Sequence, residues 1–176
     1  MENPERFLNL EIRRRIYDCI DGSPGIHFRE IQRRVVIATG SLDYHLHFLH
    51  KNGLLRTEKE GKYLRYYPVT KNFDAEEKQI LSLLRNDKIR HILIYLIENK
   101  RSLPTRMAEY LGVSNSTLSW YLKNLEEKGV IAQTKKGRFR IYRVKEPEKI
   151  VKYIIIHKNS FLDEIVDRFA DAWESV

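Results

Sequence analysis

Residues 41–55, SLDYHLHFLHKNGLL, recur further along the chain as residues 117–131, TLSWYLKNLEEKGVI. Both copies carry leucines at helical spacing on one face, followed by a glycine at the matched place: Leu42, Leu46, Leu49 and Gly53, then Leu118, Leu122, Leu125 and Gly129. Each copy continues into a short hairpin with basic residues at its glycine turn, RTEKEGKYLRYYPV and AQTKKGRFRIYRV. Two long copies are too few for a solenoid, so they predict two small domains.

Positive charge gathers in the two repeats. Residues 1–73 hold 13 Lys and Arg against 9 Asp and Glu, residues 74–145 hold 15 against 8, and residues 146–176 hold 4 against 7, within a net charge of +8. An ordinary solvated surface can be this charged, but basic surfaces also attract polyanions. We therefore expect any polyanionic partner to meet the repeats and not the acidic tail.

The spacing of apolar residues predicts three helices before each hairpin. In the first repeat we expect helices at 7–20, 29–35 and 41–51, a short strand at 26–28, and hairpin strands at 54–58 and 62–69. In the second we expect helices at 87–98, 103–111 and 116–128, and strands at 130–134 and 138–144. Ser114 can cap the third helix of the second repeat, whereas Ala38 at the matched position leaves capping to Thr39 or Ser41.

The tail after Pro147 predicts two further helices. Ser160 and Asp163 have the spacing of a capping box for the second one. Six apolar residues fall on one stripe of that helix: Phe161, Leu162, Ile165, Val166, Phe169 and Trp173. Such a stripe has to be covered, either by the chain's own domain or by a second copy in a homodimer.

Several functional classes lack their sequence signatures. No apolar run is long enough to span a membrane and residues 1–15 lack a signal core, so we expect a cytoplasmic protein without membrane contact. The single Cys19 excludes an internal disulfide. His45, His47 and His50 share a helix but not a face, so we expect no metal site. We also expect no cofactor and no enzyme activity, because nucleophile, phosphate-loop and paired-carboxylate motifs are missing.

Residues 22–55, GSPGIHFREIQRRVVIATGSLDYHLHFLHKNGLL, resemble the winged helix-turn-helix of archaeal ArsR/MarR-type transcription regulators. The resemblance rests on the order PGIH-x-RE-I, then YHL-x-x-L and a final GL, and it extends to the tail segment KNSFLDEIVDRFADAW. The chain departs from the pattern at Val36, where glycine is usual. The resemblance implies two DNA-binding domains in each chain and a C-terminal dimerisation helix.

The predicted fold class is mainly α with small β-wings (α+β). We expect an N-terminal winged helix-turn-helix domain at 1–73, a linker helix at 74–86, a second winged helix-turn-helix domain at 87–145 and a C-terminal helical segment at 146–176, with dimerisation as its expected role.

A helix that enters the major groove reads bases with its N-terminal turns, and basic wings contact the flanking DNA. In the second repeat the residues expected to contact double-stranded DNA are Asn115, Ser116, Thr117, Ser119, Trp120, Lys123, Lys135, Lys136 and Arg138. Their counterparts in the first repeat are Thr39, Gly40, Ser41, Asp43, Tyr44, His47, Lys59 and Lys62, joined by Arg29, Arg33 and Arg34. Asp43 repels phosphate, so we expect the second repeat to contribute more affinity.

Three alternatives stay open at this point. Tandem winged helices can bind a partner polypeptide through apolar groups on the third helix, for which Tyr44, Phe48 and Trp120 are candidates. They can bind nucleic acid architecturally, without reading its sequence. RNA binding is the third, and it uses aromatic stacking platforms more often. The sequence carries no residue signature for a small-molecule effector.

Overall fold

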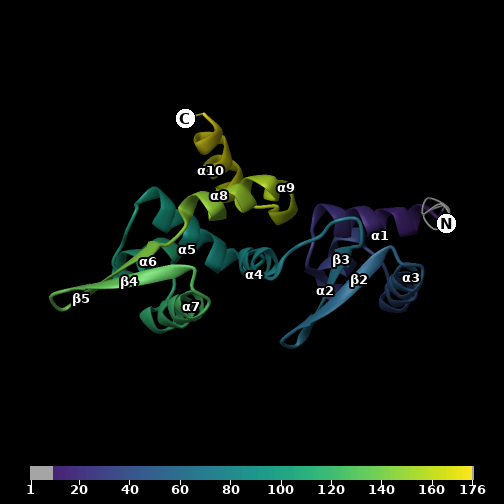
Figure 1. Cartoon of the computed structure of the whole chain (residues 1–176), viewed down its shortest axis with the longest axis horizontal. Helices are drawn as coiled ribbons and strands as arrows, with labels where there is room; N and C mark the ends of the chain where they lie inside the picture. The colour runs from purple at the N-terminus through teal and green to yellow at the C-terminus, as the bar shows by residue number, and fades with distance from the viewer. Residues whose placement is uncertain (1–9, 176) are drawn as a thin grey trace. The chain divides into compact units, whose positions relative to one another are not determined.

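The computed structural model describes residues 10–175 (Figure 1). Its contacts divide the chain into two compact units, Met1–Ser82 and Leu83–Val176. The division falls inside helix α4 (Ala75–Leu84), which forms from the residues expected to link the repeats. Among the described residues, no helix combines the length and apolar character needed to cross a bilayer.

The first unit is a helical core with a three-stranded sheet. Its elements are α1 (Glu11–Gly22), β1 (Ile26–His27), α2 (Phe28–Val35), α3 (Thr39–Lys51), β2 (Leu55–Glu60) and β3 (Tyr63–Pro68). The predicted start of the first helix at Phe7 lies outside the described residues. The strands are antiparallel in the order β1-β3-β2. The repeated leucines of α3 lie in the core with Ile16, Ile20, Ile26 and Ile31, so the periodicity identified the buried face correctly.

The second unit repeats this plan. Its first five elements are α5 (Asp87–Glu98), α6 (Pro104–Leu111), α7 (Asn115–Glu127), β4 (Ile131–Lys136) and β5 (Phe139–Val144). An isolated bridge between Ser102 and Tyr142 replaces the short first strand. The leucines of α7 are buried, as those of α3 are. The fold predicted from the sequence, mainly α with two small β-wings, is confirmed.

The tail forms α8 (Pro147–Ile156), α9 (Lys158–Phe161) and α10 (Glu164–Glu174), which belong to the second unit. The predicted capping box was wrong. Asp163 is itself the N-cap of α10 and accepts from the backbone N–H of Ile165, while Ser160 lies inside α9 and donates to the carbonyl of His157. The chain breaks between these helices because Leu162 adopts a left-handed conformation, φ 52°.

That break also divides the predicted apolar stripe. Phe161 ends α9 and Leu162 lies in the break, so the six residues do not share one helix. Phe161, Val166 and Phe169 are buried inside the second unit, which supplies the cover they need. Ile165 is half-buried, and Leu162 and Trp173 stay 76% and 43% exposed.

The turn between α2 and α3 holds a valine in a conformation that favours glycine. Val36 ends α2 in the left-handed region at φ 55°, and Gly112, at the matched place after α6, has φ 62°. Val36 is also 84% exposed, so its side chain gains little from burial. The first unit therefore adopts the same turn geometry as the second unit, at a cost in backbone strain at Val36.

We expect Val36→Gly to raise the free energy of unfolding of the first unit by about 1 kcal/mol. The left-handed conformation costs a non-glycine residue roughly 1–2 kcal/mol, and the greater freedom of glycine in the unfolded chain offsets part of the gain. Hydrogen exchange of α3 amides measures the change. Gly112→Val is the reciprocal control and should destabilise the second unit. If the α3 amides exchanged faster in Val36→Gly than in the wild type, Val36 would not be a source of backbone strain.

Candidate nucleic-acid interface

The exposed face of α7 carries the polar residues expected to read DNA. Burial of the three leucines directs six predicted contact residues outward, and all six are exposed: Asn115, Ser116, Thr117, Ser119, Trp120 and Lys123. Ser114 caps the helix as predicted, accepting from the N–H of Thr117 at 3.1 Å. Nothing in the described chain bonds the Asn115 amide group, which leaves its donor and acceptor available to a base edge.

The matching face of α3 is less suited to an anionic partner. Thr39, Gly40, Ser41, Asp43, Tyr44 and His47 are all exposed, but Asp43 is acidic. The predicted side-chain cap by Thr39 or Ser41 was wrong: Ala38 occupies the cap position and α3 has no side-chain cap. Thr39 is the first residue of α3, and its hydroxyl accepts a hydrogen bond from Gln32 Nε2 at 2.8 Å.

An exposed aromatic ring stands at the same place on both helices. Tyr44 is 60% exposed and Trp120 is 63% exposed. Each packs edge-on against the ring of the next residue, His45 at 5.2 Å and Tyr121 at 5.1 Å between centroids. The rings are thus held on the surface in a defined orientation, where they can contact a thymine methyl group or a partner protein.

The two wings differ in how their charges are balanced. In the first, formed by β2 and β3, Glu60 Oε2 pairs with Arg65 Nε at 2.9 Å, and Glu58 pairs with Lys78 at 2.6 Å. Lys59 and Lys62 are exposed, yet these acidic neighbours reduce the positive field of the hairpin.

The second wing, formed by β4 and β5, carries positive charge without acidic neighbours. Lys135, Lys136 and Arg138 are exposed and lie in no ion pair within the described chain. Sequence reasoning missed Arg140, which is exposed and lies directly across the ladder from Lys135 on the same face. Strand alternation could have revealed it. The wing therefore concentrates four cations at the end of a hairpin.

The α2 arginines do not share one role. Arg29 and Arg33 are exposed, as a phosphate contact requires. Arg34 is half-buried, forms an ion pair with Glu30 and donates to Ser23 Oγ at 2.8 Å. These contacts tie α2 to the loop after α1, so Arg34 is held within its own unit while its role as a DNA contact stays a prediction.

His45 is part of the core of the first unit. The residue is 8% exposed, and its Nδ1 is buried with no hydrogen-bond partner in the described chain. Burial lowers the pKa of His45, and nearby Arg13 lowers it further. Burial is also the largest cause lowering the pKa of His27, where Arg65 and Arg33 act in the same direction and Glu30 opposes them. Residues 10–175 contain no group of three His, Cys, Asp or Glu side chains placed to hold a metal ion.

We expect the stability of the first unit to fall as the pH drops below about 6.5, the usual histidine pKa. Because both folded pKa values lie below it, the unfolded chain binds more protons there. Stability is therefore complete above this pH and declines toward the folded values. Urea unfolding followed by NMR signals of α3, at about pH 7.5 and about pH 5, tests this. His45→Tyr, which copies Tyr121 of the second unit, should weaken the dependence of the free energy of unfolding on pH. His50→Ala, at an exposed position, should leave that dependence unchanged. If the free energy of unfolding changed equally with pH in both variants, His45 would not be a source of the pH dependence.

Comparison with known families follows the division into two units. Residues 10–81 match a family model described as an N-terminal HTH domain, and residues 85–132 match one described as winged helix-turn-helix DNA-binding. A relative from Methanocaldococcus jannaschii, named an uncharacterised HTH-type transcriptional regulator, is 30% identical over 142 residues. The match covers 81% of this chain but only 35% of that relative's length.

Solved structures with similar folds include the antimony-specific transcriptional repressor AntR, with a TM-score of 0.44, 18% identity, and coverage of 56% of this chain and 89% of that chain. NadR in complex with 4-hydroxyphenylacetate has a TM-score of 0.40, 24% identity, and coverage of 57% and 72%. A ZitR variant from Lactococcus lactis in complex with DNA has a TM-score of 0.31, 18% identity, and coverage of 80% and 97%. The two matched models, each falling on one unit, show two HTH domains in tandem, of which the second matches a winged helix-turn-helix DNA-binding model.

Proposed function

We propose that this chain is a sequence-specific regulator of transcription that binds double-stranded DNA in the cytoplasm. The observation that carries the proposal is the second unit, where the exposed polar face of α7 accompanies a wing with Lys135, Lys136, Arg138 and Arg140 exposed. Helix α7 supplies side chains for base edges and the wing supplies cations for flanking phosphates. The family description of residues 85–132 and the name of the archaeal relative support the same function.

The second unit is proposed as the stronger DNA reader. On α3 an acidic Asp43 faces outward, and in the first wing two glutamates pair with neighbouring cations. These charges weaken the attraction of the first unit for phosphates at long range.

A homodimer is a further proposal, supported by the exposed Leu162 and Trp173 in the tail. Light scattering after size exclusion should then give twice the chain mass of 21.1 kDa.

Fluorescence anisotropy tests the function directly. The full chain is titrated with a duplex from upstream of its own gene and with a scrambled duplex of equal length and composition, at several salt concentrations. We expect tighter binding to the native duplex, with a log affinity that falls linearly with log salt. Equal weak binding to both duplexes would point to an architectural role.

Binding to a partner protein is the second candidate function, and Tyr44 and Trp120 favour it because both rings are more than half exposed. The absence of DNA binding even at low salt, together with solvent protection of Trp120 by another protein, would select this function over DNA binding.

A further inference from the structure

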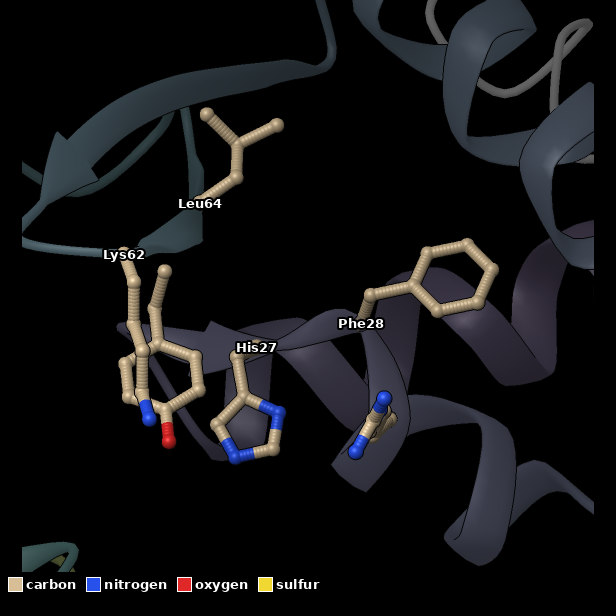
Figure 2. A pocket seen from close by; sticks show the side chains of 6 residues that line it. His27, Phe28, Lys62 and Leu64 are labelled. Atoms are coloured by element: carbon tan, nitrogen blue, oxygen red, sulfur yellow. The ribbon is translucent and has the colours of Figure 1, made fainter.

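A hollow in the first unit lies between the start of α2 and the tip of β3. It has a volume of about 380 Å³ and is lined by His27, Phe28, Arg29, Lys62, Tyr63 and Leu64. In Figure 2 the His27 and Lys62 side chains extend in the same direction, whereas Phe28 points away from them. Residues separated by 35 positions in the chain therefore meet around one space.

The hydrogen bond made by His27 determines which of its nitrogens can donate. Its Nδ1 accepts from the backbone N–H of Glu30 at 3.3 Å and caps α2. A neutral ring whose Nδ1 accepts carries its proton on Nε2. No group in the described residues accepts from that Nε2–H. The ring itself is held by a stack on Tyr63, with 5.1 Å between centroids and 16° between planes.

Cations line the same hollow as this donor, and the acidic residues Glu30 and Glu60 are paired with other cations. Lys62 Nζ lies 5.3 Å from the Tyr63 ring centroid, and Arg29 lines the same hollow with no partner in the described chain. Glu30 pairs with Arg34 on α2, and Glu60 on β2 pairs with Arg65. Arg65 Cζ also lies 5.3 Å from the Tyr63 centroid, on the strand that forms the wall. The hollow therefore offers donors and positive charge without a free carboxylate.

Among the described residues, the matched positions of the second unit do not repeat this combination. The second wing keeps a cation beside an aromatic ring, with Arg138 Cζ 5.1 Å from the Phe139 centroid. However, Leu103 and Thr105 stand at the positions that match His27 and Arg29. A hollow near that place contains Arg101 and Arg106 but no histidine. The repeat alone thus does not explain why the first unit has this set.

We propose that the hollow around His27, Arg29 and Lys62 binds a phosphate group. Phosphate oxygens accept from several directions at once, and the site presents an imidazole N–H, a guanidinium and an ammonium around one space. The phosphate comes either from the backbone of bound DNA or from a free phosphate compound. Only the first source rests on the proposed function. The site would give the first unit a local contact for an anion. Helix α3 of that unit does not offer such a contact, because Asp43 on its exposed face is acidic.

NMR of the full chain tests the proposal, with the His27 Nε2 signal and the backbone amide of Lys62 as reporters. Inorganic phosphate is titrated at constant ionic strength, balanced with chloride, and the DNA duplex is titrated in a second series. We expect saturable shifts with phosphate, and about tenfold weaker phosphate binding in Arg29→Ala and in Lys62→Ala, the usual effect of losing a charge-assisted hydrogen bond. Lys51→Ala, an exposed lysine at the end of α3 and outside the hollow, is the matched control and should bind phosphate as the wild type does.

The role of His27 as a donor is separated from its role as a cap by His27→Ser. Serine retains an oxygen that can cap α2 but removes the Nε2–H. This variant should keep its amide spectrum and lose phosphate affinity, read from the Lys62 amide. If it binds phosphate as tightly as the wild type, the imidazole is not part of the site and the proposal fails.

The two titrations distinguish the possible sources. Shifts with both phosphate and duplex support a DNA backbone phosphate in the hollow. Shifts with phosphate alone, while anisotropy shows duplex binding, support a free phosphate compound. If the duplex does not bind but phosphate does, the proposed function fails and the site stands. No saturable shift with phosphate, or equal shifts with chloride, would overturn the site.

Discussion

Asp163→Ala is expected to lower the free energy of unfolding of the second unit by about 3–5 kcal/mol, the usual cost of leaving a buried charge without its partner. Arg90 is 4% exposed and donates to Asp163 Oδ2 through Nε at 2.9 Å and through a second guanidinium nitrogen. His91 Nε2 lies 2.8 Å from the same oxygen. Removal of the carboxylate would also uncap α10, because Asp163 Oδ1 accepts from Ile165 N–H at 3.1 Å.

The same contacts determine how this unit responds to acid. Burial alone would raise the pKa of Asp163, but the hydrogen bonds and charges of Arg90 and His91 outweigh it and hold the pKa below its usual 3.8. The stabilisation is thus present above about pH 4 and is lost as the pH falls through the lower folded pKa. Asp163→Asn should retain the cap and lose the charge, and so fall between wild type and alanine.

Tryptophan fluorescence measures this loss selectively. The chain has two tryptophans, Trp120 and Trp173, and both belong to the second unit. Urea unfolding followed at these rings therefore reports that unit and not the first. Asp171→Ala is the matched control, because it removes an acid of the same helix whose side chain is 76% exposed; we expect a change of no more than about 0.5 kcal/mol. An equal effect of the two substitutions would show that the buried pair adds no stability.

Removal of the second wing's charges is expected to have the largest effect on DNA binding. In Lys135→Ala/Lys136→Ala/Arg138→Ala, the slope of log affinity against log salt should become shallower by about 3, since each neutralised phosphate contributes roughly 0.9. Affinity at low salt should fall on the order of tenfold to a hundredfold. All three side chains are exposed and unpaired in the described structure, so the fold should be unaffected.

A charge-matched variant separates local contact from net charge. Lys145→Ala/Lys152→Ala/Arg168→Ala also removes three positive charges, from exposed positions at the base of the hairpin and on α8 and α10. Its salt slope should stay near that of the wild type. If both triple variants lose the same slope, binding depends on overall charge, and the wing has no contact of its own.

Local patterns account for most of the fold predictions that proved correct. Helical periodicity placed Leu42 and Leu118 in the cores, and the repeated glycines marked the hairpin turns, including Gly61 and Gly137, both at positive φ. Such signals involve residues a few positions apart, where backbone geometry alone relates their side chains. The break at Leu162 escaped this reasoning, because apolar spacing continues through it and only packing against α5 and α8 favours two separate helices.

Local sequence patterns were sufficient to predict two winged domains, the buried faces of α3 and α7, and a second wing more basic than the first. Three features depend on how distant elements pack: Arg34 is engaged within its own unit, Asp163 pairs with Arg90, and His27 meets Lys62 around a hollow. The physical reason is range. Periodicity and charge are properties of neighbouring residues, whereas an ion pair or a binding site depends on which distant elements pack together and on the burial that this packing creates.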